Sequence, residues 1–252
     1  MNTQLLQHLN PAQRDAVLYT EGPQLVIAGA GSGKTRVLTY KIAHLLSTGY
    51  EPWRILALTF TIKAANEMKE RIAKLVSKEV ASRLWMGTFH SMCLRILRQE
   101  AEVLGYTRDF SVYDTTDSKS VIKHIIKDFR LDDKVYKVAV VFGRISMAKN
   151  LLQTPDQYAA NRDYLLRDRF DKMHDMARIY AEYNRRLKAA NAMDFDDLIV
   201  KTVELFKNCP EILENYQERF QYICVDEYQD TNTAQFQFVS LLAKKYQNLC
   251  VV

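Results

Sequence analysis

The sequence predicts an α/β fold: a mainly parallel sheet with helices on its faces, interrupted by an all-helical insertion. Short apolar runs alternate with amphipathic helical stretches up to about residue 105. This alternation is the order expected of βα units on a parallel sheet. Glycine almost disappears between about residues 106 and 191, where long charged helical patterns dominate, and the alternating pattern resumes near Asp194.

The first part of the chain carries the clearest signals. Asn10-Pro11 begins a helix, with asparagine as the cap and proline at the first helical position. The run Leu25-Val26-Ile27-Ala28 predicts a strand that leads into a glycine-rich segment. The remaining patterns predict, in chain order, a helix at 34–46, a strand at 55–59, a helix at about 63–76, a strand at 84–88 and a helix at about 89–104.

The later parts of the chain differ in their residue patterns. Helical patterns at 116–129 and 168–190 predict an insertion made of helices. After it we expect a helix through Phe206, another before Phe220, a strand at 222–225, a helix at about 233–246 and a final strand at 249–252. These patterns predict a first sheet segment at 1–107, the helical insertion at 108–190 and a second sheet segment at 191–252.

Composition is that of a folded, soluble protein. With 252 residues, 48% hydrophobic and 26% charged, the chain can form one large domain or two modest ones. The formal charge of +5 is compatible with a polyanionic partner. The four cysteines lack CxxC spacing, so we expect reduced thiols rather than a zinc site or disulfides. The sequence contains no recognisable secretory leader or membrane-length apolar run, and we expect a cytoplasmic protein.

The glycine-rich segment has the pattern of a phosphate-binding P-loop, or Walker A motif. Between a strand and a helix, the N–H groups of small residues and the helix N-terminus face a phosphate. Lys34 is expected to reach the β and γ phosphates, and the Thr35 hydroxyl to bind Mg²⁺. The alternative is a glycine-rich turn followed by a chance Lys-Thr pair. The predicted loop consists of Ala28, Gly29, Ala30, Gly31, Ser32, Gly33, Lys34 and Thr35.

A pair of carboxylates supplies the second half of such a site. Asp226 and Glu227 follow the predicted strand at 222–225, which puts them at the carboxyl end of a parallel strand. Asp226 is expected to hold Mg²⁺, and Glu227 to orient and deprotonate the attacking water. An acidic pair after a strand is also common as a solvated turn. Together with a complete phosphate loop, however, the pair predicts a nucleoside-triphosphate hydrolase.

Gln13 is a candidate for recognition of the base. It lies in the first predicted helix, just before the strand that leads to the loop. An amide donates and accepts at once, so it can read the adenine edge and favour ATP over GTP. The alternative is an exposed helix glutamine without a role, and the residue alone leaves both interpretations open.

The sequence resembles the UvrD/Rep/PcrA family of superfamily 1 helicases, through motifs in family order along almost the whole chain. The resemblance rests on Leu9-Asn10-Pro11-Ala12-Gln13, on the phosphate loop and on Asp226-Glu227-Tyr228-Gln229-Asp230-Thr231-Asn232. Leu58-Thr59-Phe60-Thr61 with Lys63-Ala64-Ala65 and Glu67-Met68 is similar to motif Ia, Gly87-Thr88-Phe89-His90-Ser91 to motif Ib, and Met193-Asp194-Phe195-Asp196-Asp197-Leu198 to a further block. The family implies a RecA-like P-loop NTPase domain (1A) that carries a helical subdomain (1B).

The resemblance also implies where DNA and nucleotide bind. Single-stranded DNA is expected to pass Thr59, Phe60, Thr61, Lys63, Thr88, Phe89 and His90. Aromatic and imidazole faces stack on bases without reading sequence, whereas hydroxyls, lysine and backbone amides contact phosphates. A core aromatic and a helix-capping histidine are the alternatives for Phe60 and His90. Ile62 stands where the family usually has asparagine, so one polar contact of motif Ia is in doubt.

Three further roles follow from the family. Gln13 is expected to recognise adenine, Arg36 to lie close to the nucleotide, and Gln229 to couple the nucleotide site to movement. The 1B subdomain helps to contact duplex DNA, and its basic candidates are Lys119, Lys123, Lys127, Arg144 and Lys149. Most of these residues are expected to form a solvated face.

The implied activity is that of an ATP-dependent 3′–5′ DNA helicase and translocase in repair or replication. It would bind ATP with Mg²⁺, single-stranded DNA and junctions of single- and double-stranded DNA. The family continues into a second RecA-like domain whose arginines complete the ATP site, so we expect this chain alone to be weakly active or inactive. The alternatives are the motor of a helicase–nuclease complex and a non-hydrolysing nucleic-acid-binding module. Residue chemistry alone does not separate DNA from RNA.

Overall fold

The computed structural model describes residues 6–29 and 31–252, which form two compact units. Of the described residues, unit 1 contains 6–29, 31–92, 206–231 and 236–252, and unit 2 contains 93–205 and 232–235. The unit boundaries therefore fall within helices, near residues 92 and 205. The boundaries expected from the sequence, near 107 and 190, lie beside a short strand pair instead.

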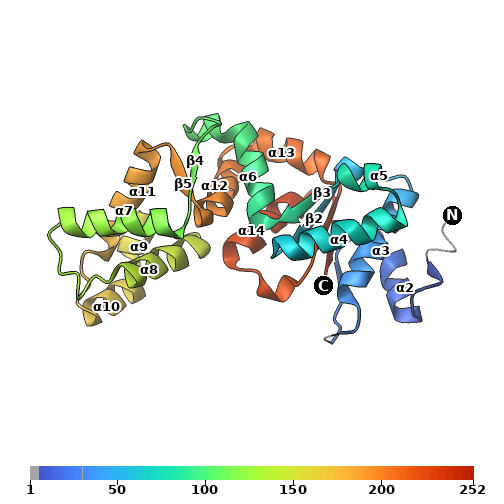
Figure 1. Cartoon of the computed structure of the whole chain (residues 1–252), viewed down its shortest axis with the longest axis horizontal. Helices are drawn as coiled ribbons and strands as arrows, with labels where there is room; N and C mark the ends of the chain where they lie inside the picture. The colour runs from blue at the N-terminus through green and yellow to red at the C-terminus, as the bar shows by residue number, and fades with distance from the viewer. Residues whose placement is uncertain (1–5, 30) are drawn as a thin grey trace. The chain divides into compact units, whose positions relative to one another are not determined.

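Unit 1 is built on a five-stranded parallel sheet with strand order β1-β7-β6-β2-β3 (Figure 1). Four of the expected strands form close to their expected positions. The strands are β1 (Gln24–Leu25), β2 (Ile55–Thr59), β3 (Trp85–Thr88), β6 (Tyr222–Val225) and β7 (Leu249–Val251). β1 is shorter than expected, although the Val26 N–H still donates to the Val251 carbonyl over 2.9 Å. β1 is an edge strand, so one side of its backbone has no neighbouring strand in the described sheet.

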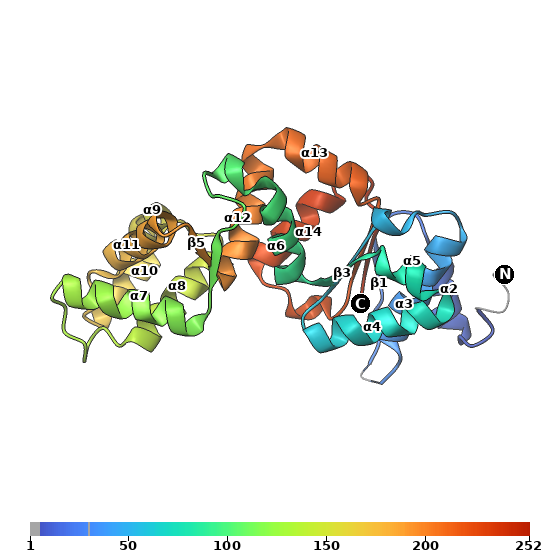
Figure 2. The same cartoon turned by 45° about the horizontal axis from the view of Figure 1, so that its top comes forward.

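Helices cover both faces of this sheet. Ile55 and Ala57 of β2 pack with residues of α3 (Lys34–Ser47) and α4 (Ile62–Leu75) in one buried cluster. The alternate residues of a strand face the opposite side. Figure 2 shows α14 (Thr233–Ala243), most of which belongs to unit 1, on the opposite side of the sheet from α4. α6 (Phe89–Glu100) begins in unit 1 and continues into unit 2. Two further helices of unit 1 are α5 (Lys78–Ser82) and α13 (Pro210–Arg219), and short 3₁₀ turns span Pro52–Arg54 and Tyr228–Asp230.

Unit 2 consists mainly of helices, as the sequence predicts. Its core brings together apolar residues of α7 (Thr115–Asp128), α8 (Val138–Asn150) and α11 (Met176–Ala189). The other helices are α9 (Pro155–Ala160), α10 (Arg162–Phe170), α12 (Phe195–Asn208) and a 3₁₀ turn at Ala101–Leu104.

Two features of unit 2 differ from the expectation. The insertion is not purely helical, because β4 (Ser111–Tyr113) pairs in parallel with β5 (Ala192–Asp194). The helix expected over 168–190 is divided between α10 and α11. The break follows from local geometry: Lys172 adopts a left-handed φ of 58°, and the Met173 N–H donates to the Asp168 carbonyl over 2.7 Å. Such closures usually carry glycine, so a lysine in this place gives no signal in the sequence.

Candidate functional site

The phosphate loop occupies the connection between β1 and α3, as the sequence predicts. Gly31 and Gly33 have φ values of 75° and 89°, a left-handed conformation that glycine adopts without strain. The Ser32 N–H donates to the Gly29 carbonyl over 3.2 Å, which curls the loop back before α3 begins at Lys34. The first N–H groups of α3 follow this loop directly, and N–H groups at a helix start suit a bound anion. Ala30 belongs to the predicted loop but lies outside the described residues.

Lys34 and Thr35 stand at the junction of the predicted phosphate loop and α3. Both side chains are half-buried at the start of α3. The Lys34 ammonium donates to the Ala28 carbonyl at the other end of the loop, 3.2 Å away. This contact folds the lysine over the loop, which is the position from which an ammonium group reaches bound phosphates.

The end of β6 brings a carboxylate to the same place. The Thr35 hydroxyl lies 3.5 Å from Asp226 Oδ2, although 191 positions separate the two residues. The Asp226 N–H donates to the Leu58 carbonyl over 3.0 Å, so the parallel ladder with β2 fixes the backbone of the aspartate. Burial, together with the neighbouring Glu227, raises the pKa of Asp226. Asp226 Oδ1 is buried and has no hydrogen-bond partner among the described residues.

These groups fit a divalent cation. Mg²⁺ is usually held by one or two protein oxygens together with water and phosphate oxygens, so a complete cage of protein ligands is not needed. The unpartnered Oδ1 of Asp226 and the adjacent Thr35 hydroxyl offer such oxygens. The described residues contain no group of three or more histidine, cysteine or acidic side chains placed to hold a metal by themselves.

Glu227 has a strained backbone. Its φ of 50° is left-handed, a conformation that costs a non-glycine residue free energy and is concentrated at functional sites. Gln229 Nε2 donates to Glu227 Oε2, so the side chain expected to couple the site to movement already contacts the expected base. The Tyr228 N–H donates to the Val252 carbonyl over 2.8 Å, which ties this turn to the chain beyond β7.

Gln13 contacts the phosphate loop directly. Its Nε2 donates to the Ser32 carbonyl over 3.0 Å, and its Oε1 accepts the Asn10 N–H over 3.2 Å. A Cβ at Gly33 would lie 2.9 Å from Gln13 Nε2, so a larger residue at Gly33 would displace the amide. A primary amide has two N–H groups and two lone pairs, so one of each remains for an adenine edge.

Arg36 lies on the exposed side of α3. Its Nη2 donates to the His8 carbonyl over 2.7 Å, and its guanidinium lies 5.4 Å from the centre of the Tyr40 ring. These contacts hold Arg36 beside the segment that carries Gln13. The expected closeness to a nucleotide stays a prediction.

The expected DNA residues cluster at the carboxyl ends of β2 and β3. Phe60 and His90 are half-buried, and Thr61 and Lys63 are exposed at the start of α4. The Thr61 hydroxyl accepts the Ala64 N–H over 3.1 Å and so caps that helix. Exposed polar groups at a helix start beside a half-buried aromatic ring suit a nucleic-acid strand.

Three members of the expected DNA set are buried. Thr59 is 1% exposed, Thr88 9% and Phe89 1%. The Phe89 ring packs against the rings of Phe60 and Phe238, with ring centres 5.4 Å and 6.4 Å away, and is closed to solvent. We therefore infer that Phe89 supports the ring of Phe60 and does not contact a base itself.

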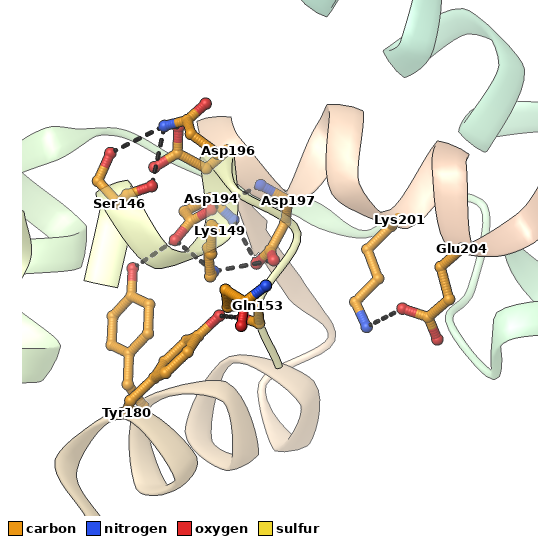
Figure 3. Close-up of polar contacts among 11 residues, drawn as sticks. Ser146, Lys149, Gln153, Tyr180, Asp194, Asp196, Asp197, Lys201 and Glu204 are labelled. Atoms are coloured by element: carbon orange, nitrogen blue, oxygen red, sulfur yellow. Dashed lines mark hydrogen bonds and ion pairs between the residues drawn. The ribbon is translucent and has the colours of Figure 1, made fainter. Parts of the chain in front are cut away.

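Two basic candidates of the helical insertion are wrong. Figure 3 shows the end of Lys149 between Asp194 and Asp197, with Nζ–oxygen distances of 2.7 Å and 2.8 Å. Burial opposes the charge of Lys149, but the two aspartates outweigh it and raise its pKa. Arg144 is held by Asp168 and Asp171. Both cations are neutralised within the fold, so neither is available to a phosphate.

The remaining basic candidates stay accessible. Lys123 and Lys127 are exposed on α7 and line a groove together with Arg130 and Lys137. Lys119 lies 5.6 Å from the centre of the Phe142 ring. Two aspartates, Asp132 and Asp133, also line the groove, so its basic character is partial.

The structure also adds residues that the motifs do not name. Lys149 and Asn150, at the end of α8, bind all three aspartates of the Met193–Leu198 block: Asn150 Nδ2 donates to Asp196 Oδ1 over 3.1 Å. Asn150 Oδ1 also accepts from Asn232 over 2.6 Å. A lysine and an asparagine in a charged helical pattern read as solvated residues, so the sequence gives no signal for this cluster.

Two further expectations concern the state of the cysteines and the presence of membrane-length helices. The four cysteines are free thiols, three of them buried. Within residues 6–29 and 31–252, none of the helices combines the length and the apolar character that a bilayer crossing requires.

Comparison with known proteins reveals close similarity over nearly the whole chain. ATP-dependent DNA helicase PcrA of Staphylococcus aureus (strain Mu50 / ATCC 700699) is 52% identical over 250 residues, which cover 98% of this chain and 33% of the relative. The PcrA helicase of Bacillus subtilis (strain 168) is 49% identical over 253 residues, which cover 100% of this chain and 33% of the relative. The chain thus spans about a third of the length of the curated relatives it matches.

A family model described as the UvrD/REP helicase N-terminal domain matches residues 9–252. The match includes Gln13, the phosphate loop, both expected DNA motifs and Asp226-Glu227. The parallel sheet of unit 1 agrees with the RecA-like domain that the sequence predicts. The chain belongs to the UvrD/REP helicase N-terminal domain family.

Proposed function

We propose that this chain is the nucleotide-binding and DNA-tracking part of an ATP-dependent 3′–5′ DNA helicase and translocase. One observation carries the proposal: the Thr35 hydroxyl of the phosphate loop lies 3.5 Å from Asp226, with Glu227 next in the chain. Phosphate cradle, metal-binding oxygens and base are thereby combined at one edge of a parallel sheet. The names of the PcrA relatives, which are ATP-dependent DNA helicases, support the proposal.

Each residue has a definite task in this proposal. The loop N–H groups and Lys34 bind the phosphates, and Gln13 recognises adenine. Thr35 and Asp226 would hold Mg²⁺, which when bound supplies positive charge to the phosphate oxygens. Glu227 orients a water molecule and accepts its proton, and Gln229, which already contacts Glu227, responds to loss of the γ phosphate.

DNA is proposed to cross the carboxyl ends of β2 and β3. Bases stack on Phe60 and His90, and phosphates meet Thr61, Lys63 and backbone N–H groups. Such contacts accept any base, as a translocating motor requires. A role in DNA repair or replication, junction binding, and a cytoplasmic location belong to the same proposal.

A second motor domain is proposed in the part of the relatives that this chain does not match. About two thirds of each relative lies outside the matched region. Arginines from such a domain can accelerate phosphoryl transfer by about 10³- to 10⁵-fold. We therefore expect this chain to bind ATP but to hydrolyse it weakly by itself.

The test is substitution of the expected base. E227Q in a protein that joins this chain to a second motor domain is expected to lower the ATP turnover number by at least about 100-fold, because the amide cannot accept the proton. ATP binding, measured by calorimetry with Mg²⁺, should stay within about twofold. Steady-state hydrolysis with and without single-stranded oligonucleotide provides the measurement.

The matched control is E204Q, because Glu204 is a carboxylate of α12 remote from the phosphate loop in sequence and paired with Lys201. Its turnover should equal that of the unmodified protein. Turnover by E227Q equal to that of the control would remove Glu227 as the base and favour a non-hydrolysing module. Turnover that single-stranded DNA does not stimulate would count against the DNA motor.

A further inference from the structure

Lys41 is a buried cation that the nucleotide site does not use directly. It lies on α3, seven positions after Lys34, and is 0% exposed. Its ammonium donates to the Ala16 carbonyl over 2.8 Å, to Gln24 Oε1 over 2.6 Å and to the Tyr19 carbonyl. Three N–H groups thus meet three acceptors, and the hydrogen-bonding capacity of the side chain is fully used.

The three acceptors of Lys41 carry no formal charge. Burial accordingly lowers the pKa of the ammonium. Ala16 belongs to the last turn of α2 (Pro11–Leu18), and Tyr19 is its C-terminal cap. Carbonyls at a helix C-terminus lack helical partners and carry partial negative charge, so they are the neutral groups best able to hold a buried cation. Lys41 therefore links α3 to the C-terminal end of α2 through two backbone carbonyls.

α2 packs against α3 through a small apolar cluster that includes Val17 and Val37, and polar bonds hold its two ends. The helix has eight residues, too few to be stable by itself in water, and Val17 is its one buried residue. Gln13, near its N-terminus, contacts the phosphate loop through the Ser32 carbonyl. Lys41 holds the opposite end, and the Gln24 side chain reinforces it by donating to the Ala16 carbonyl over 3.0 Å. The helix is thus fixed at one end by the loop and at the other by Lys41.

We propose that Lys41 is a positioning residue for base recognition: by holding the C-terminal end of α2, it sets the place from which Gln13 meets the adenine of ATP. The inference rests on the proposed function, in which Gln13 recognises adenine. Loss of the three bonds at one end of so short a helix lets it tilt, and a tilt moves the Gln13 amide away from the loop. The proposed phosphate-binding groups, Lys34 and the loop N–H groups, include no side chain of α2, so recognition of the base is expected to change more than binding of the phosphates.

The experiment compares binding of ATP and of GTP, each with Mg²⁺, to the chain and its variants by calorimetry. K41M removes the donors while keeping an unbranched side chain, and is expected to lower ATP affinity about fivefold, the effect of one lost hydrogen bond. GTP affinity should change less, so the ratio of ATP to GTP affinity falls. K41R keeps charge and donors and should retain most of the ratio. Q24A, a milder change, should lower the ratio in the same direction.

A double substitution separates positioning from general damage. If Lys41 acts through Gln13, K41M in the Q13A background lowers the ratio no further than Q13A alone. T202V is the matched structural control, because the buried Thr202 hydroxyl donates to the Leu198 carbonyl over 2.7 Å in unit 2. It should reduce thermal stability without a change in the ratio.

The outcomes separate the proposed role of Gln13 in adenine recognition from the proposed role of Lys41 in positioning Gln13. An unchanged ratio in Q13A would overturn adenine recognition by Gln13, and the role of Lys41 with it. A ratio that falls in Q13A but not in folded K41M would overturn the role of Lys41 alone. If K41M does not fold, Q24A decides: an unchanged ratio there overturns the inference, and a reduced ratio supports it.

Discussion

At the scale of single residues, the site combines groups that strand ends and helix starts hold in place. Thr35 opens α3, and Asp226 ends a buried strand. Both residues are anchored by secondary structure, and their side-chain oxygens lie 3.5 Å apart. The left-handed φ of Glu227 is the exception. It lies between the end of β6 and the 3₁₀ turn at Tyr228–Asp230, so it changes the direction of the chain directly after Asp226.

The sequence identified these residues as candidates for the site, but it did not predict which of them are buried. The phosphate loop and the acidic pair are defined by spacing, because the reaction requires fixed residue types there. Burial is a property of the folded environment. Phe89 and Phe60 are equally aromatic in the sequence, yet Phe89 is 1% exposed and its ring is enclosed by other core rings.

This difference between the two rings yields a prediction. F60A is expected to weaken binding of single-stranded DNA by about 1–3 kcal/mol, the usual value of one base–aromatic stack, and equally for different homopolymers. Fluorescence anisotropy with labelled dT and dA oligonucleotides measures it. F89L serves as the comparison: it should lower thermal stability, since it disturbs the core, and weaken DNA binding less. A larger loss of DNA affinity in F89L than in F60A would refute the assignment.

At the scale of elements, sequence patterns located helices and strands but not their interruptions. The expected helix over 168–190 is broken after Phe170, where the chain turns at Lys172 with a left-handed φ. A lysine in this conformation does not change the helical periodicity of the sequence. β4 and β5 have three residues each, too few for an alternating pattern to be recognised.

The ion pairs of Lys149 set the role of the Met193–Leu198 block. Asp194 and Asp197 are 4% exposed, and each contacts Lys149. Burial and the charge of Asp194 raise the pKa of Asp197 to about 6. Two carboxylates and one ammonium thus share a buried space at the junction of α8 and α12. We infer that this part of the block is structural.

Removal of the lysine is therefore expected to destabilise unit 2. K149M leaves two buried carboxylates without their cation, and breaking a buried pair typically costs about 3–5 kcal/mol. Chemical denaturation followed by circular dichroism measures the loss. The control is K123M on exposed α7, expected to change stability by less than about 0.5 kcal/mol. Equal stability of K149M and K123M would show that Lys149 is not part of the buried cluster.

At the scale of the whole molecule, net charge says little about where DNA binds. The excess of +5 is spread over a chain with 35 basic and 30 acidic residues, and many of the basic residues are paired. Lys149 and Arg144 form ion pairs with aspartates that are close in space but distant in sequence, so their charges are not available to DNA. The sequence could not predict this, because pairing depends on the fold. The groove at α7 is the surface of unit 2 that keeps Lys123 and Lys127 exposed.

The last prediction uses this groove and the salt dependence of binding. Each phosphate contact by a cation releases condensed counterions, which gives a slope of about −0.9 in log affinity against log salt for duplex DNA. K123A/K127A is therefore expected to reduce the slope for a duplex with a single-stranded tail by about 1.8.

K207A/K244A, which removes two exposed lysines from unit 1, carries the same net charge and is the matched control. If the groove contacts duplex phosphates, K123A/K127A lowers the slope and K207A/K244A leaves it nearly unchanged. Equal changes of the slope in both variants would mean that only net charge matters. For single-stranded DNA without a duplex, the slope of each variant should equal that of the unmodified chain.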